Sequence, residues 1–233
     1  NAIINGITDW VYEEEFAFVR AFDWSADSKN IAFIRFDESE VPEFSMSVFE
    51  KNLYPKIETF KYPKAGEKNA VVSLHIYNVD SNLKKDINLG NYNDFYIARM
   101  KWTNDVNVLC AQVLNRHQDN LDLIFVDANY GTSKVILNEK DNAYVDVTDN
   151  LTFLKDNSFI WTSEKDGFNH IYLYDKTGKL KNQVTKGNWE VTSCYGFDEK
   201  TKTVFYQSVE NGSINRDVYR IGLDGKNKVR LSS

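Results

Sequence analysis

The sequence predicts an all-β chain that carries one short helix. Short runs rich in β-branched and aromatic residues recur along its 233 residues, and turn-forming residues separate them. The chain is 42% hydrophobic and 14% aromatic, which is ample for a buried core and argues against disorder. At this length it can form one large all-β domain or two smaller ones.

Only residues 8–22 are predicted to be helical. Asp9 is the expected N-cap, because a short acidic side chain can accept a hydrogen bond from the unpaired amides of a first helical turn. Glu13, Glu14 and Glu15 follow it. Three adjacent carboxylates repel one another beside an apolar stretch, so they indicate a cationic partner. The alternative is a solvated helix end that favours acidic residues through the helix dipole alone.

Five runs have the composition of β-strands. Each is short, rich in β-branched and aromatic residues, and followed by a turn that contains Asp, Asn or Gly. We therefore predict strands at residues 31–36, 73–79, 108–114, 121–126 and 170–174.

An aromatic residue, a polar turn and an apolar strand recur as a unit in four places. The anchor aromatics Trp24, Trp102, Phe153 and Phe197 are separated by 78, 51 and 44 residues. The last two steps match the roughly 40 to 50 residues of a propeller blade. The first step is longer, so residues 40–70 are predicted to be an insertion of irregular chain and an extended hairpin. The pattern favours a partial β-propeller of about four to five blades over unrelated hairpins in a sandwich.

Charge and cysteine content disfavour several classes of function. The formal net charge of −6, with lysines spread among carboxylates, argues against a nucleic-acid partner. No apolar run approaches the roughly 18 residues of a membrane span. Cys110 and Cys194 each lie in a hydrophobic strand-like run, which favours two buried free thiols over a disulfide. The three histidines lack zinc-motif spacing, and neither a metal nor a cofactor is predicted.

Two further sets of candidates have structural interpretations. No nucleophile accompanies His170, so a structural role at the start of a strand is favoured over catalysis. Trp10, Trp161 and Trp189 could stack on sugars, but their even distribution through the repeats favours core packing.

Two segments are more distinctive than the blade repeats. Residues 9–16 are Asp-Trp-Val-Tyr-Glu-Glu-Glu-Phe, and residues 62–69 are Tyr-Pro-Lys-Ala-Gly-Glu-Lys-Asn. They resemble the glutamate motif and the tyrosine-proline-lysine-alanine-glycine segment of the dipeptidyl peptidase IV group of the prolyl oligopeptidase family. Residues 162–174 and 184–191 are similar to the later blade motifs of that group, which many propellers share. The resemblance runs in order through essentially the whole chain.

The resemblance implies a serine exopeptidase. In that family an eight-bladed propeller caps an α/β-hydrolase domain with a Ser/Asp/His triad. The enzymes release dipeptides from peptide amino termini, with proline or alanine preferred at the second position. The resemblance assigns Glu14 and Glu15 to binding of the substrate amino group. Glu13 matches the first glutamate of the motif, for which no direct substrate role follows.

The resemblance also implies what the chain lacks. Residues 1–233 would be a fragment of a single β-propeller domain, and the α/β-hydrolase domain would lie elsewhere on the same polypeptide. The chain contains no Gly-x-Ser-x-Gly nucleophile elbow, so no catalytic residue is assigned and the chain alone is expected to be inactive. An aromatic residue on the leaving-group side is expected near Tyr144 and Val145, but residues 146–149 depart from the family pattern and receive no role.

The expected partners are peptides with a free amino terminus and the hydrolase domain, and a homodimer of the parent is an open alternative. The low cysteine content favours a bacterial source, and a periplasmic or cell-envelope location follows from family habit alone. The runner-up function is a non-catalytic periplasmic β-propeller that binds peptides or proteins. A third hypothesis, an endo-acting or acyl-peptide-cleaving relative, has no use for an amine-binding glutamate pair.

Overall fold

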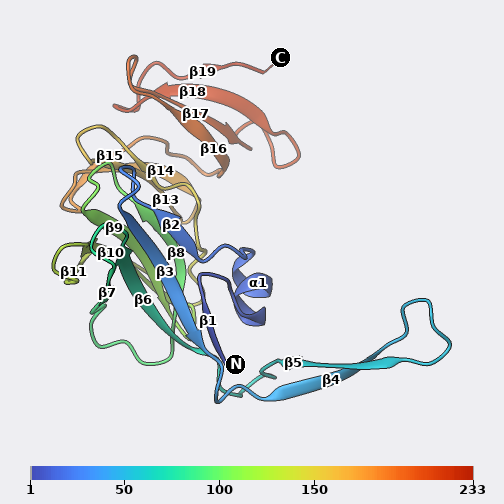
Figure 1. Ribbon diagram of the computed structural model, residues 1–233. Coiled ribbons are helices and arrows are strands. Elements are labelled where there is room, and N and C mark those ends of the chain that lie inside the picture. Colours follow the sequence, from blue (N-terminus) through green and yellow to red (C-terminus); the bar gives the residue numbers. More distant parts are fainter. Residues whose placement is uncertain (1, 233) are drawn as a thin grey trace.

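The computed structural model describes residues 2–232 and confirms an all-β architecture with one short helix (Figure 1). Within these residues, four antiparallel sheets of four or five strands follow one another along the chain, and a fifth sheet has only two strands. Each of the four larger sheets corresponds to one of the four sequence repeats, and we number these sheets blades 1 to 4. The architecture is the predicted partial β-propeller, and it has four blades, the lower end of the expected four to five.

Blade 1 is a five-stranded sheet in which two short strands share one partner. Its strands are β1 (Ile3–Asn5), β2 (Phe22–Trp24), β3 (Asn30–Asp37), β6 (Val71–Asn78) and β7 (Leu83–Asp86). β1 pairs with the end of β3, with Ile3 opposite Asp37, and β2 pairs with its beginning, with Trp24 opposite Ile31. The edge strand of blade 1 is therefore interrupted, and helix α1 (Trp10–Phe16) lies in the interruption.

Blades 2, 3 and 4 are four-stranded meanders. Blade 2 contains β8 (Phe95–Trp102), β9 (Val108–Asn115), β10 (Asn120–Asp127) and β11 (Ser133–Lys140). Blade 3 contains β12 (Thr152–Phe153), β13 (Phe159–Ser163), β14 (His170–Tyr174) and β15 (Leu180–Gln183). Blade 4 contains β16 (Val191–Asp198), β17 (Thr203–Ser208), β18 (Asp217–Gly222) and β19 (Val229–Arg230). The anchor aromatics of the sequence repeats all lie in the first strand of a blade or, in blade 1, in β2.

Side chains and turns at the anchor positions join neighbouring blades. The indole of Trp102 donates to the carbonyl of Asp23 at 3.1 Å, which links blade 2 to blade 1. Between blades 2 and 3, Gly178 has φ +85° and lies so close to the Ile136 carbonyl that a β-carbon would collide with it. The side-chain amide of Asn182 donates to a backbone carbonyl in the β18–β19 turn at 2.8 Å, which links blades 3 and 4. The repeated turns therefore serve as inter-blade contacts as well as chain reversals.

The insertion in the first repeat is a long hairpin between β3 and β6. β4 (Glu43–Val48) and β5 (Lys56–Lys61) form a separate two-stranded sheet that projects away from the blades (Figure 1). Its tip exposes apolar side chains, with Leu53 85% and Tyr54 80% exposed. The hairpin predicted within residues 40–70 is confirmed.

The predicted helix is correct at its start and wrong at its end. Asp9 has extended backbone and its carboxylate accepts a hydrogen bond from the Tyr12 amide at 3.0 Å, so the predicted N-cap is confirmed. The helix stops at Phe16 instead of extending to residue 22, because Ala17 adopts a left-handed conformation with φ 55°. Beyond it, the Ala21 amide donates to the Gly6 carbonyl and the chain enters β2. Pairing with blade 1 therefore overrides helical propensity after the second turn.

Two of the three tryptophans assigned to the core pack as predicted. Trp161 is buried in the larger core cluster, and Trp189 is partly buried against the core of blades 3 and 4. Trp10 is 37% exposed, so its assignment to the core is wrong. The reason is that Tyr12 and Phe16 occupy the buried face of α1, and Trp10, two residues before Tyr12, lies about 200° away around the helix.

The structural assignment of His170 is confirmed, and that of the cysteines only in part. His170 is fully buried, and its ring nitrogens lie 3.1 Å from the Thr185 hydroxyl and 2.9 Å from the Gly187 carbonyl. Both cysteines are free, but only Cys110 is fully buried, whereas Cys194 is partly exposed. Within residues 2–232, no helix has the length and apolar character needed to cross a membrane.

Candidate functional site

Helix α1 lies in a second, shorter insertion, between β1 and β2 and separate from the β4–β5 hairpin. Backbone pairing closes this insertion at its base. Ile7 and Arg20 form an isolated antiparallel bridge, and the Thr8 amide donates to the Val19 carbonyl at 3.1 Å. The two ends of the insertion therefore stay together at the edge of blade 1, and α1 is presented beside the sheet (Figure 1). This arrangement lets a helix of seven residues stay ordered although such a length is marginal in isolation.

One face of α1 is anchored in an aromatic cluster. Tyr12 and Phe16 are buried, and the Tyr12 ring lies 4.8 Å from that of Phe36 and 5.9 Å from that of Tyr96. The Tyr12 hydroxyl also accepts a hydrogen bond from the Ile97 amide at 2.8 Å. Since Tyr96 and Ile97 belong to β8, the helix is fixed to blade 2 as well as to blade 1.

The opposite face of α1 presents the three glutamates. Glu13, Glu14 and Glu15 are all exposed, because positions 12 and 16 take the buried face and leave the residues between them outside. In the part of the chain that the structure describes, none of the three forms an ion pair with a lysine, arginine or histidine. The carboxylate of Glu15 accepts a hydrogen bond from the side-chain amide of Gln118 at 2.7 Å.

The two distinctive sequence segments are in contact. The Trp10 ring packs on the Tyr62 ring with centroids 4.3 Å apart. Further along the second segment, the Asn69 side chain donates to the Tyr96 hydroxyl at 2.9 Å, and Tyr96 also packs on Phe16. The glutamate helix and residues 62–69 therefore form one structural unit, although residues 17–61 separate them in the sequence.

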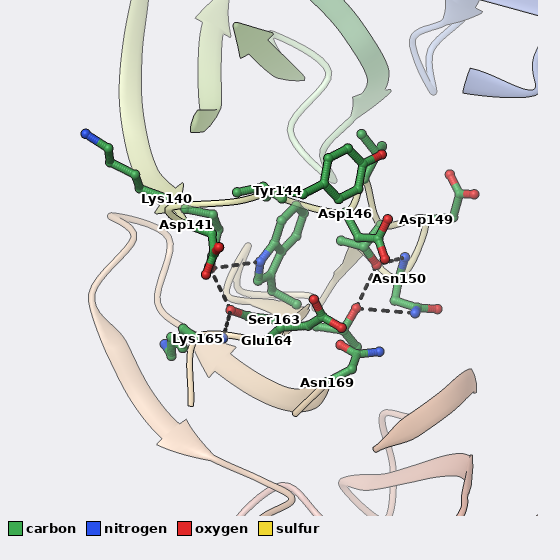
Figure 2. A pocket seen from close by; sticks show the side chains of 16 residues that line it. Lys140, Asp141, Tyr144, Asp146, Asp149, Asn150, Ser163, Glu164, Lys165 and Asn169 are labelled. Carbon is green, nitrogen blue, oxygen red and sulfur yellow. Dashed lines mark hydrogen bonds between the residues drawn. The ribbon is translucent and has the colours of Figure 1, made fainter. Parts of the chain in front are cut away.

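A pocket lies at the segment that received no role from the sequence. Residues 139–150 form one wall and residues 161–165 most of the other, and together they enclose about 360 Å³ (Figure 2). Thr148 and Thr162 share a hydrogen bond of 2.6 Å between the two walls. Tyr144 and Val145, where the family pattern places an aromatic residue, belong to this lining.

The pocket is rich in carboxylates. Burial raises the pKa of Glu164, and the charges of Asp146, Glu190 and Asp141 raise it further. Burial also raises the pKa of Glu139, whose carboxylate accepts hydrogen bonds from the Trp161 indole at 3.2 Å and the Ser163 hydroxyl at 2.7 Å. Both pKa values are shifted upward, which means that the ionised carboxylates are less favourable in this lining than in water.

Lys165 also lines the pocket, but its ammonium group is directed at aromatic rings. It donates to the Tyr174 hydroxyl at 2.6 Å and lies 3.9 Å from the centre of the Tyr172 ring. Burial lowers the pKa of Lys165, while the charges of Glu139 and Asp166 oppose that shift. Lys165 therefore forms no direct ion pair with Glu164 or with the acidic residues near it.

The pocket and the glutamate helix are joined through Gln118. Its side chain donates to Glu15, and its backbone carbonyl accepts from the Val145 amide at 2.8 Å. The pKa of Tyr144, which lines the pocket, is raised by burial and then by the charges of Asp146 and Glu15. Gln118 therefore links Glu15 to the Val145 side of the pocket lining.

Comparison with known proteins identifies the class to which this arrangement belongs. The family model described as "Dipeptidyl peptidase IV (DPP IV) N-terminal region" matches residues 1–233. The chain therefore belongs to the dipeptidyl peptidase IV family and represents its N-terminal region.

Individual relatives agree with this assignment. The crystal structure of Porphyromonas gingivalis dipeptidyl peptidase 4 superimposes with a TM-score of 0.93 at 46% identity, covering 100% of this chain and 33% of that one. Dipeptidyl peptidase 4 from Trichophyton equinum is 30% identical over 95% of this chain and 30% of its own length. The protein of that name from Trichophyton rubrum is 30% identical over 96% of this chain and 31% of its own length. The chain thus spans about a third of the length of each of these relatives.

The N-cap of α1 gives a test of how the helix is held. Asp9 is buried, and burial raises its pKa; Glu38 is also buried, and its pKa is raised by burial and then by the charge of Asp9. Asp9→Ala removes the cap and is expected to destabilise the helix by about 1 kcal/mol. Asp9→Asn keeps an acceptor and removes the charge, so it is expected to cost less than Asp9→Ala at neutral pH.

The pH dependence of this contribution has a defined sign. Because the pKa of Asp9 is raised in the folded state, the folded chain binds this proton more tightly than the unfolded chain does. The contribution of Asp9 to stability therefore increases as the pH falls through its folded pKa, and the increase is complete below its unfolded pKa. Asp9→Asn should lose that increase. Hydrogen exchange of the α1 amides at neutral and mildly acidic pH measures both effects, and an identical pH dependence in the two proteins would contradict the assignment.

Proposed function

We propose that the full-length protein is a serine exopeptidase that releases X-Pro and X-Ala dipeptides, with Glu14 and Glu15 anchoring the free amine of the substrate. The observation that carries the proposal is the exposed glutamate face of α1, in a chain that belongs to the dipeptidyl peptidase IV family. Helix and pocket together offer carboxylates to a positively charged peptide end.

The chemistry of the amino terminus supports this role. A peptide α-amino group has a pKa of about 7.7 to 8.0 and is largely protonated at neutral pH. Two carboxylates can accept hydrogen bonds from one ammonium, and charge-assisted bonds of this kind are stronger than neutral ones. An interior peptide nitrogen carries no charge, so the glutamates would favour a chain end and thereby fix the length of the product.

The other parts of the proposed enzyme rest on the family alone. We propose that a Ser/Asp/His hydrolase domain on the same polypeptide supplies the catalysis, and that this chain by itself is inactive. A periplasmic or cell-envelope location, a bacterial source and a homodimer stay predictions.

The proposal is tested with a free and an acetylated substrate. The full-length protein is expected to cleave a glycyl-prolyl amide reporter at least about 100-fold faster, in kcat/KM, than the same reporter with an acetylated amino terminus. Release of the reporter group measures both rates, and a serine-directed inhibitor should abolish both. Equal cleavage of the two substrates would contradict an amine anchor, and no cleavage of either would favour a non-catalytic peptide-binding propeller.

A further inference from the structure

We propose that Gln118 is a positioning residue that holds Glu15 in the orientation needed to receive the substrate amine. The inference rests on the proposed function of Glu15 and assigns a role to a residue outside the glutamate motif. Gln118 acts through Glu15 and does not contact the reacting atoms.

The contact is directional. The side-chain nitrogen of Gln118 lies 2.7 Å from Oε1 of Glu15. An ionised carboxylate only accepts hydrogen bonds, so the amide nitrogen must be the donor. The bond engages Oε1 and leaves Oε2 of Glu15 without a hydrogen bond to any residue within 2–232. The amide oxygen of Gln118 is itself buried and has no partner among these residues.

The turn that carries Gln118 is strongly constrained. Gln118 lies in the β9–β10 connection with φ 58°, a left-handed conformation that is uncommon for a residue other than glycine. The side-chain oxygen of Asn115 accepts from the amides of Asp119 and Asn120, each at 3.1 Å. The Gln118 carbonyl accepts from the Val145 amide on the pocket side at 2.8 Å. These contacts fix the backbone of the turn, so the Gln118 side chain starts from a defined position beside Glu15.

Glu15 needs such a constraint because of its place in the helix. It lies in the last turn of α1, two residues before left-handed Ala17, and its side chain is exposed. A free glutamate side chain would lose rotamer freedom on binding an amine. The hydrogen bond from Gln118 orders it beforehand, which improves substrate binding without a new substrate contact.

The test is Gln118→Gly in the full-length protein. Glycine accommodates φ 58° and retains the backbone carbonyl that binds Val145, so the variant removes the side chain and keeps the turn. We expect KM for a free-amine dipeptidyl amide to rise about tenfold, with kcat within about twofold, because the lost interaction acts on amine binding. Lys202→Gly, at another turn with φ 53°, is the matched control and should leave both constants unchanged.

A double-mutant cycle separates this role from a structural one. In a Glu15→Ala background Gln118 has no carboxylate to hold, so Gln118→Gly should raise KM no further. An equal rise in both backgrounds, or no rise when Glu15 is present, would overturn the positioning role. If Glu15→Ala alone left KM unchanged, the proposed amine anchor would be wrong. This variant leaves Gln118 intact, so it separates failure of the anchor from failure of the positioning role.

Discussion

Replacing Glu14 and Glu15 together with glutamine in the full-length protein is expected to lower kcat/KM for a free-amine dipeptidyl amide by about a thousandfold. Removing one partner of a desolvated charge pair typically costs about 2 to 5 kcal/mol, and about 1.4 kcal/mol corresponds to a factor of ten. Taking about 2 kcal/mol for each carboxylate gives roughly a 30-fold loss for each single substitution. Glutamine keeps the size and an acceptor oxygen, so the change isolates charge.

The size of the loss reports the environment of the bound amine. Both glutamates are exposed in this chain, and an exposed ion pair contributes below about 1 kcal/mol, equivalent to roughly a fivefold loss. A loss near a thousandfold in the double variant therefore requires that the bound peptide and the rest of the protein exclude water from the pair. A loss of only a few-fold would place the amine at a solvated surface.

Glu13 supplies the internal control. It is exposed on the same helix and has no assigned substrate role, so Glu13→Gln removes one of the three adjacent charges without touching the anchor. Its kcat/KM should stay within about twofold of the parent. A loss equal to that of Glu14→Gln would show that the total negative charge of the helix matters and would contradict a specific pair.

The blade architecture was predictable because it depends on local patterns. Aromatic anchors, turn residues and short β-branched runs recur at the spacing of a blade, and every predicted strand lies within or largely overlaps an observed one. The N-cap at Asp9 was predictable for the same reason, since the residue and the amide that it binds are three positions apart.

The rest of the candidate region depends on contacts that no local pattern encodes. Gln118 and Glu15 are 103 residues apart, and nothing in the turn sequence around Gln118 distinguishes it from an ordinary hairpin. The end of α1 at Phe16 depends on pairing with blade 1, which interrupts a segment that has helical character in isolation. The pocket formed by residues 139–150 and 161–165 likewise becomes visible only when two neighbouring blades are brought together.

The second large effect is expected at Tyr12, which joins the glutamate helix to the propeller. Its side chain is 2% exposed and packs against Phe16, Phe36 and Tyr96. Tyr12→Ala should destabilise this region by about 3 to 5 kcal/mol, the range for truncating a large buried aromatic side chain. Tyr130→Ala is the matched control, since Tyr130 is 81% exposed and its removal should cost less than about 0.5 kcal/mol.

Tyr12→Phe separates the hydrogen bond from the packing. It keeps the ring and removes the hydroxyl that accepts from the Ile97 amide at 2.8 Å, which leaves a buried donor without its partner. The expected cost is about 1 to 3 kcal/mol. Hydrogen exchange should be faster at the Ile97 amide in Tyr12→Phe, and at the amides of the whole α1 helix in Tyr12→Ala. Unchanged protection of α1 in Tyr12→Ala would mean that the base of the insertion, closed by Ile7 and Arg20, is sufficient to hold the helix.

The Tyr12 variants also connect stability to the proposed activity. Helix α1 sets the backbone position of the exposed Glu14 and Glu15. Loosening the helix at Tyr12 should therefore raise KM for free-amine substrates, although both carboxylates are still present in the chain. In Tyr12→Phe the ring still packs, and the rise in KM should be smaller than in Tyr12→Ala, in the same order as the loss of protection. If KM stayed constant while α1 lost its protection, amine binding would not depend on an ordered helix, and the glutamates could not be the residues that set the position of cleavage.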